Sequence, residues 1–421
     1  MSFQQGLSGL NATSKNLEVI GNNIANASTF GAKSSRAEFS DMYATAINGA
    51  GASSIGIGVN LSTVAQQFTQ GNIVATENSM DLSINGAGFF QVTDGNSPVS
   101  YTRNGQFKVD RDGYVVNNQK DRLMGYPADG TGTIQPGQAK ALQMPTAGIT
   151  PSATSRIKLE MNLDARAKVT LPAAGPAIDL ADATTYNNAT SLVAYDAKGQ
   201  DVALTYYFQK AATDQWNVYV TANGVPLATD ASGNPAASTT IVFPANGSAP
   251  TSPVGNVTLN IPAAVNAVGA STLPIPGVLF NIAGATEFGS QFAVTDLSQD
   301  GYAPGQMVGI SFESNGIVMA RYSNGQSKPA GQVEIATFRN PQGLQPTGGN
   351  GWSRTYSSGD PIVGTPGDGI LGALQSAALE ESNVDLTAEL VSMITAQRVY
   401  QANAQTIKTQ DQVLQTLVNL R

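Results

Sequence analysis

The sequence LEESNVDLTAELVSMITAQRVYQANAQTIKTQDQVLQTLVNLR, residues 379–421, decides the fold because it lies in the longest stretch of the chain without glycine or proline. Ser382 and Asp385 match an S-x-x-D capping box, which predicts a helix from about Asn383 nearly to the end of the chain. At about 1.5 Å per residue this rod is roughly 50 Å long. A 4-3 heptad seam follows, and it needs a partner. Its positions are Leu386, Leu390, Met393, Gln397, Tyr400, Ala404, Ile407, Asp411, Leu414 and Val418.

The partner is predicted at the other end of the chain, where a shorter stripe has the same spacing. Its apolar members are Phe3, Leu7, Leu10, Leu17 and Ile24. Ser14 and Gly21 occupy the remaining seam positions and should allow close approach. Two arrangements remain open: a two-helix clasp within one chain, or a pair of helices ordered only by self-assembly, which the pattern favours.

Within one subunit we expect the two helices to be antiparallel, because the chain leaves along the first and returns along the second. Ile24 and Leu386 should then both lie at the end nearest the β-core. The residue numbers of contacting pairs should add up to a nearly constant value.

The composition argues against an enzyme but does not exclude one. The 421 residues include no histidine and no cysteine, which excludes His-based triads, thiol nucleophiles, disulfides and the usual zinc sites. Charged residues are 12% of the chain and the net charge is −8, so a nucleic-acid binder is not indicated. No run reaches transmembrane length, and no cleavable secretory signal is apparent. We expect no cofactor, no metal site and no membrane insertion.

Several motifs resemble the bacterial flagellar rod and hook proteins. NNIANASTFGAK (22–33) is similar to that family's N-terminal signature, and the C-terminal stretch matches its closing helix. GAGFFQV (86–92), YTRNGQFKVDRDGYVV (101–116) and ATFRNPQGLQPTGGNGWSRT (336–355) resemble its core-domain motifs. The signature positions are Asn22, Asn23, Asn26, Thr29, Gly31 and Lys33. Phe30 precedes the glycine here, where the family has its aromatic after it.

The predicted fold is mainly β with α-helical termini, in a nested multidomain arrangement. Residues 1–30 and 373–421 should form a coiled-coil layer, and 31–76 a Gly/Ser/Ala-rich connector with little core of its own. Short alternating strands predict a discontinuous inner β-domain, 77–146 and 300–372, with an outer β-domain, 147–299, inserted into it. Asp110-Arg111-Asp112-Gly113 predicts a hairpin turn, since the later ligands of a calcium loop are absent.

The resemblance implies a structural subunit that polymerises into a curved tube between rod and filament, through the apolar seam positions of both helices. Its implied partners are further copies of itself, the distal rod, the hook cap, the hook–filament junction protein and the flagellar type III export gate. It also implies an extracellular location, reached without a cleaved signal.

Phe39 and Tyr43 match a short export pattern, but an amphipathic turn in the connector explains them equally well. A distal rod subunit is the alternative within the family; the large inserted domain favours the hook. From another class, a secreted β-rich glycosidase would need two facing carboxylates, and no such pair is apparent.

Overall fold

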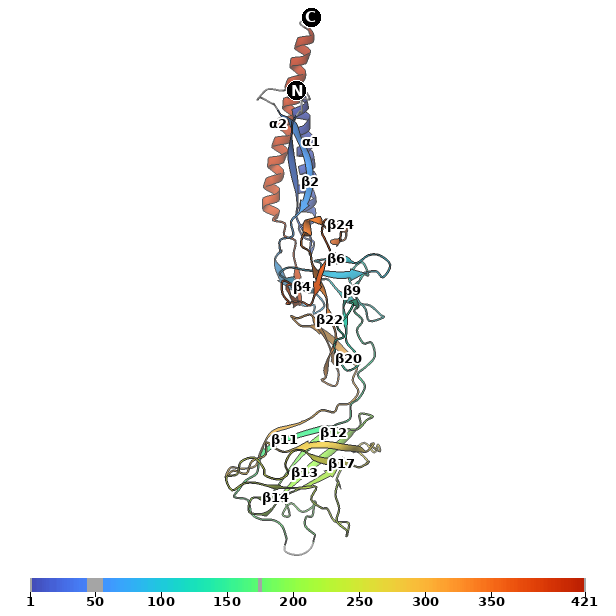
Figure 1. Ribbon diagram of the computed structural model, residues 1–421, viewed down its shortest axis with the longest axis vertical. Coiled ribbons are helices and arrows are strands. Elements are labelled where there is room, and N and C mark those ends of the chain that lie inside the picture. The colour runs from blue at the N-terminus through green and yellow to red at the C-terminus, as the bar shows by residue number, and fades with distance from the viewer. Residues whose placement is uncertain (1, 44–55, 173–175, 420–421) are drawn as a thin grey trace. The chain divides into compact units, whose positions relative to one another are not determined.

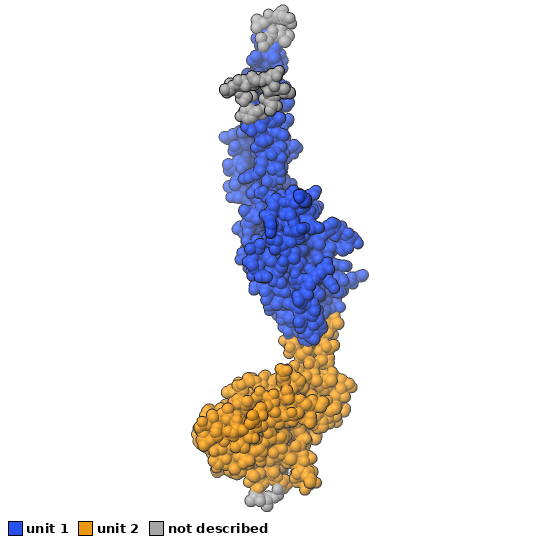
Figure 2. Space-filling model, in the orientation of Figure 1, with its two compact units in different colours: residues 1–146, 309–321, 327–421 blue, residues 147–308, 322–326 orange. Residues whose placement is uncertain are grey.

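The chain contains two compact units, shown in different colours in Figure 2, in a computed structural model that describes residues 2–43, 56–172 and 176–419. Unit 1 comprises residues 1–146, 309–321 and 327–421, and unit 2 comprises residues 147–308 and 322–326. Unit 2 therefore begins where the sequence predicts the outer β-domain to begin. It ends at 308 instead of 299 and includes the turn 322–326.

Two helices lie at the ends of the described chain: α1 (Ser2–Ala25) and α2 (Leu386–Asn419). The predicted capping box is wrong, because Asp385 alone caps α2. Its Oδ1 accepts hydrogen bonds from the backbone N–H groups of Thr387 (2.9 Å) and Ala388 (3.1 Å). The hydroxyl of Ser382 instead accepts the N–H of Val384. Neither helix has a stretch long and apolar enough to cross a membrane within its described residues.

The predicted connector contains a long antiparallel pair of strands, β1 (Ser35–Tyr43) and β2 (Gly56–Gln66). This pair packs along α1 in Figure 1, and its strands, which the sequence analysis did not predict, are partly buried or exposed where their side chains are described. Side chains of α1 hold it there: the Gln5 amide donates to Gly56 O (2.6 Å), and the Asn23 side chain exchanges two 2.8 Å bonds with the backbone of Ser35.

The rest of unit 1 is a β-domain built from both ends of the chain. Two strand pairs, β27–β4 and β28–β3, join residues near 73–85 to residues just before α2. The other 13 strands of this β-domain form one sheet with the central order β20-β21-β22-β9-β5-β6-β25-β24. The strands are β3 (Ile73–Ala75), β4 (Leu82–Asn85), β5 (Phe89–Thr93), β6 (Ser100–Thr102), β7 (Lys108–Val109), β8 (Val115–Val116), β9 (Arg122–Pro127), β10 (Lys140–Ala141), β20 (Met307–Phe312), β21 (Ile317–Tyr322), β22 (Ser327–Val333), β23 (Ile335–Thr337), β24 (Gln345–Gly348), β25 (Gly351–Ser353), β26 (Ile362–Gly364), β27 (Ala373–Ser376) and β28 (Ala378–Glu380), with a 3-10 turn η1 (Pro341–Gly343).

Asp110 closes the β7–β8 hairpin as predicted. Its Oδ1 accepts the N–H groups of Asp112 (2.9 Å) and Tyr114 (2.8 Å), and its carbonyl accepts that of Gly113 (3.1 Å).

Unit 2 consists of two sheets around one core. The order is β12-β13-β14-β15 in one sheet, with β16 on β14, and β17-β18-β11-β19 in the other. Alternate residues of β13 are buried, which is the pattern the sequence predicts for Val202–Phe208. The stacked rings of Tyr206 and Phe280, 5.0 Å apart, join the sheets. The strands are β11 (Arg156–Asn162), β12 (Asn188–Tyr195), β13 (Asp201–Ala212), β14 (Gln215–Ala222), β15 (Val225–Pro226), β16 (Thr239–Val242), β17 (Val257–Ile261), β18 (Ile275–Asn281) and β19 (Ala293–Gln299).

Because the hydrophobic cores of unit 1 take no residue from 147–308, we expect unit 1 to fold without unit 2. Ile149 and Gly305 pair as an antiparallel bridge, so residues 150–304 can be replaced by a two-residue Asn-Gly turn. Circular dichroism and thermal unfolding should give a single cooperative transition for the shortened chain. A shortened chain without cooperative unfolding would contradict the independence of unit 1.

Candidate assembly surface

Helices α1 and α2 are antiparallel, as predicted. They pack against each other within one chain, which is the two-helix clasp and not the favoured alternative of helices ordered only by self-assembly. A Cβ at Gly6 would lie 3.2 Å from Ile407 Cγ1, one at Gly9 would lie 2.9 Å from Asn403 Nδ2, and the Asn23 amide donates to Glu389 Oε1 at 2.9 Å. The residue numbers of these pairs add up to 412 or 413. The close approach therefore occurs at Gly6 and Gly9. Gly21 does not provide it, because a Cβ there would have no neighbour within 4 Å.

The face of α1 that turns inward lies one residue before the predicted seam. Gly6, Thr13 and Ile20 are buried at seven-residue spacing, and Ala396 is the buried position on α2. Small side chains at three of these four sites bring the backbones together. Ile407 of the predicted seam lies in the helix contact, whereas several other large apolar seam residues are exposed.

The structure places the predicted seam residues in two groups. Partly buried are Leu10, Leu17, Ile24, Met393 and Ile407. Exposed are Phe3, Leu7, Leu386, Leu390, Tyr400 and Leu414. Val418 belongs to α2, but its side chain lies outside the described part.

Four more apolar side chains on α2 are exposed and were missed by the seam analysis: Val391, Ile394, Val399 and Val413. Together with the exposed seam residues they are 37 to 59% accessible, which is unusual for so many large apolar residues on two neighbouring helices. One chain alone therefore leaves much of its helix surface without an apolar neighbour.

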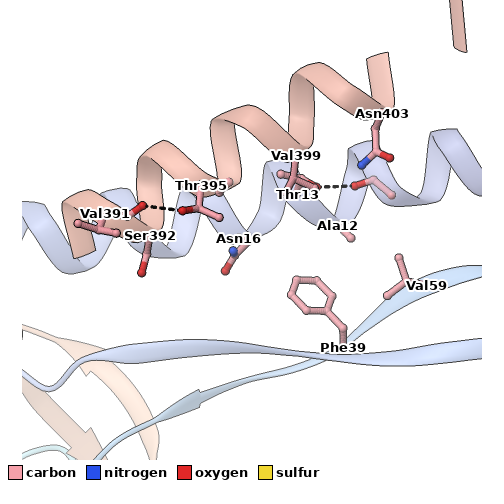
Figure 3. A pocket seen from close by; sticks show the side chains of 12 residues that line it. Ala12, Thr13, Asn16, Phe39, Val59, Val391, Ser392, Thr395, Val399 and Asn403 are labelled. Atoms are coloured by element: carbon pink, nitrogen blue, oxygen red, sulfur yellow. Dashed lines mark hydrogen bonds between the residues drawn. The ribbon is translucent and has the colours of Figure 1, made fainter. Parts of the chain in front are cut away.

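A groove of about 530 Å³ lies between the two helices and the β1–β2 pair (Figure 3). Phe39 extends from β1 toward the helices, and Ala12, Val59, Val391 and Val399 add apolar surface. The predicted export residue Phe39 is thus a groove residue that is 39% exposed. Tyr43 ends β1, paired through its backbone with Gly56, and its side chain lies outside the description.

The signature segment forms a joint between the helices and the β-domain. Asn23 is buried and binds both Ser35 and Glu389. Asn26 and Thr29 cap the end of α1: the Asn26 amide donates to Asn22 O (2.9 Å), and the Thr29 hydroxyl donates to Asn26 O (2.9 Å). These bonds turn the chain from α1 toward β1.

Gly31 is required by both its conformation and its surroundings. Its φ is +71°, and a Cβ would lie 2.5 Å from Asn104 N. Its N–H donates to Glu380 O at 2.8 Å. The backbone of the signature therefore lies directly against the β-domain and the segment before α2.

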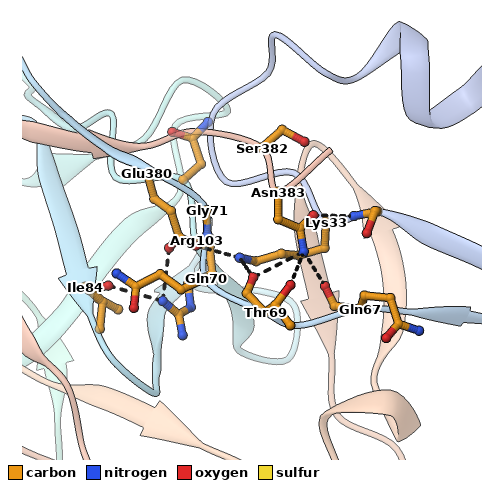
Figure 4. A network of polar contacts seen from close by, with 12 residues as sticks. Lys33, Gln67, Thr69, Gln70, Gly71, Ile84, Arg103, Glu380, Ser382 and Asn383 are labelled. Atoms are coloured by element: carbon orange, nitrogen blue, oxygen red, sulfur yellow. Dashed lines mark hydrogen bonds and ion pairs between the residues drawn. The ribbon is translucent and has the colours of Figure 1, made fainter. Parts of the chain in front are cut away.

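At the centre of the joint, Glu380 binds two buried cations (Figure 4). Its Oε1 accepts from Lys33 Nζ at 2.6 Å and from Gly71 N at 2.9 Å, and its Oε2 accepts from Arg103 Nη1 at 3.0 Å. The Lys33 and Glu380 side chains are 0% exposed and that of Arg103 is 6% exposed. Burial lowers the pKa of Lys33 and of Arg103, and the Glu380 carboxylate opposes this by favouring their charged forms.

Asn383 completes the joint beside Lys33 (Figure 4). Its Oδ1 accepts from Ser34 N at 2.7 Å, and its Nδ2 donates to Gln67 O and to Thr69 Oγ1, both at 2.8 Å. Sequence reasoning singled out Lys33 but missed Glu380, Arg103 and Asn383. No local sequence pattern marks these three residues, because their partners are distant in the sequence.

The two helices offer exposed apolar side chains for contact, and the joint around Glu380 supports the helices rigidly against the β-domain. Among the described residues, no three Asp, Glu, His or Cys side chains come together as a possible metal site.

Comparisons with known proteins agree along the whole chain. Residues 3–33 match the family "Flagella basal body rod protein", residues 83–171 "Flagellar hook protein FlgE/F/G D1 domain", residues 162–302 "Flagellar basal body protein FlaE D2 domain" and residues 375–420 "Flagellar basal body rod FlgEFG protein C-terminal".

Among individual proteins, the chain is 40% identical to the flagellar hook protein FlgE of Salmonella typhimurium, over 100% of both chains. It is 32% identical to that of Rhizobium meliloti, over 100% of this chain and 98% of the relative. The crystal structure of Helicobacter pylori flagellar hook protein FlgE2 shares the fold, with a TM-score of 0.52 and 15% identity over 73% of this chain and 100% of that one.

Proposed function

Because the chain belongs to the flagellar hook protein FlgE family, we propose that its two terminal helices are the surface through which copies assemble into the hook. The chain is a structural subunit of the bacterial flagellar hook. Its full-length similarity, which includes the domain at 162–302, does not favour a distal rod subunit or a glycosidase.

The observation that carries this proposal is the row of large apolar side chains that one chain leaves exposed on α1 and α2. Burial of apolar surface contributes roughly 25 cal/mol per Å², so helix faces that meet in a polymer supply a substantial driving force. The self-assembly residues are the predicted seam members, with the exposed ones, such as Leu7 and Leu390, facing neighbouring subunits.

The joint around Glu380 gives this surface a second property. The segments next to the two helices are tied to the β-domain by buried ion pairs, and a bond between Asn23 and Glu389 joins the helices to each other. Such a joint can transmit torque, because several bonds resist rotation of the helices against the β-domain. We assign the signature residues Asn22, Asn23, Asn26, Thr29, Gly31 and Lys33 to this joint. In the polymer, the helices form the inner layer, with the inner and outer β-domains around it.

The subunit has no enzymatic role, and it meets the distal rod, the hook cap and the hook–filament junction protein. It reaches the cell exterior through the flagellar type III export gate without a cleaved signal, with Phe39 and Tyr43 as the candidate export residues. The motivation is family membership, together with the exposure of Phe39 on β1.

Negative-stain imaging of the concentrated, purified chain tests the proposal. We expect tubes from the full chain, and monodisperse particles from a chain that ends at Asp385 and therefore lacks α2. The second chain is a matched control, because the hydrophobic cores of the β-domain contain no α2 residue. Monodisperse particles from the full chain at every concentration would contradict the proposal.

A further inference from the structure

The groove between the helices and the β1–β2 pair has an unusual electrostatic character. Its lining contains no charged side chain, and Val391 and Val399 on its rim are 59% and 47% exposed. An occupant that carried a charge into this groove would lose hydration and find no opposite charge. The groove therefore selects an uncharged, apolar occupant.

Among the exposed apolar stripes on the described parts of the two helices, one meets this requirement. Residues 2–14 of α1, SFQQGLSGLNATS, include no charged residue, and Phe3 and Leu7 lie one helical turn apart on its exposed face. The stripe at Leu386 and Leu390 differs, because Asp385 and Glu389 flank it. The stripe at Val413 and Leu414 follows Lys408 and Asp411.

The occupant comes from another copy, because a chain cannot fill its own groove with this stripe. Gly9, Ala12, Thr13 and Asn16 of α1 line the groove, and α1 is one continuous helix from Ser2 to Ala25. Phe3 and Leu7 are therefore held beyond the groove, on the same rigid rod.

We propose that the groove receives Phe3 and Leu7 from α1 of a second copy of this chain. This inference rests on the proposed function and specifies which surfaces meet in the polymer. The contact is heterologous, since the stripe and the groove are different parts of the molecule. Repetition therefore builds an extended assembly instead of a closed pair. Phe39, on the groove wall, becomes covered in this contact.

Disulfide trapping tests the contact directly, because the chain has no cysteine of its own. Two single variants, Leu7→Cys and Val399→Cys, are mixed as monomers, assembled and mildly oxidised. The disulfide can then form only between copies. The matched control replaces Val399→Cys with Ile394→Cys, which lies on α2, is similarly exposed (53%) and does not line the groove. We expect at least tenfold more Leu7–Val399 than Leu7–Ile394 heterodimer on a denaturing gel.

Tubes with equal or no crosslinking at the two positions would overturn the inference and leave the proposed function standing. Absence of tubes from the unsubstituted chain would overturn the proposed function, and the inference with it.

If the cysteine variants do not assemble, filling the groove provides a second measurement. Ala12→Trp should raise the concentration needed for tube formation at least tenfold, while circular dichroism of the monomer stays unchanged. Gln401→Trp, on an exposed α2 position outside the groove, serves as its control. Normal assembly of Ala12→Trp would contradict the inference.

Discussion

Replacement of Glu380 by glutamine is expected to lower the free energy of unfolding of unit 1 by about 3–5 kcal/mol, the usual cost of removing one partner from a buried ion pair. Glutamine keeps the shape of the side chain but removes the charge shared by Lys33 and Arg103, which lie 2.6 and 3.0 Å away. Both cations would remain buried beside a neutral amide. Urea unfolding followed by circular dichroism measures the loss.

Glu381→Gln is the matched control, because it makes the same charge change one residue later. Among the described residues, the Glu381 side chain has no ion pair. We expect a change below about 0.5 kcal/mol there. Lys33→Met should cost less than Glu380→Gln, since Arg103 still neutralises the carboxylate. Equal stability of the Glu380 and Glu381 variants would show that the buried pairs do not hold the joint.

Leu390→Asp is expected to abolish tube formation while leaving the monomer folded. Leu390 is 46% exposed in the single chain, so a carboxylate there remains hydrated. In a polymer that covers this face, the same carboxylate would be buried without a partner, at a cost of several kcal/mol in every subunit. Sedimentation of assembled material, with thermal unfolding of the monomer, separates the two effects.

Ile407→Asp should behave differently, because Ile407 contacts Gly6 in the same chain. It should impair both helix pairing and assembly. Gln405→Asp introduces the same charge at an exposed polar position and should be tolerated. Normal tubes from Leu390→Asp, or equal loss from Gln405→Asp, would argue against the exposed helix face as the assembly surface.

The sequence predicts the features that repeat locally. Seven-residue spacing predicts both helices, although the inward face of α1 lies one residue before the predicted seam, and alternation predicts strands such as β13. The β1–β2 pair escapes prediction because its residues are only partly buried or exposed, so neither strand needs strict alternation of polar and apolar residues. Its Gly/Ser/Ala-rich surroundings are typical of a linker as well.

The start of α2 shows how tertiary contacts override a local signal. A capping box at Ser382 is compatible with the sequence, but Asn383 is held by Ser34, Gln67 and Thr69. These bonds keep the segment extended, so the helix begins only at Leu386. The Glu380 network depends equally on distant partners, and no local pattern around residues 33, 103 or 380 reveals it.

The long sequence separations within the joint determine when its contacts can form as the chain is made and folds. Lys33 and Glu380 are 347 residues apart, and Asn23 and Glu389 are 366 residues apart. Contacts this distant form slowly, and none can form before almost the entire polypeptide is available. A chain that lacks its last residues retains the bonds of Asn23 to Ser35 and of Lys33 to Thr69, but it lacks the contacts of Lys33 with Glu380 and of Asn23 with Glu389. Closure of the joint therefore requires the C-terminal part of the chain, and we expect a truncated subunit to hold its first helix less firmly than the full chain does.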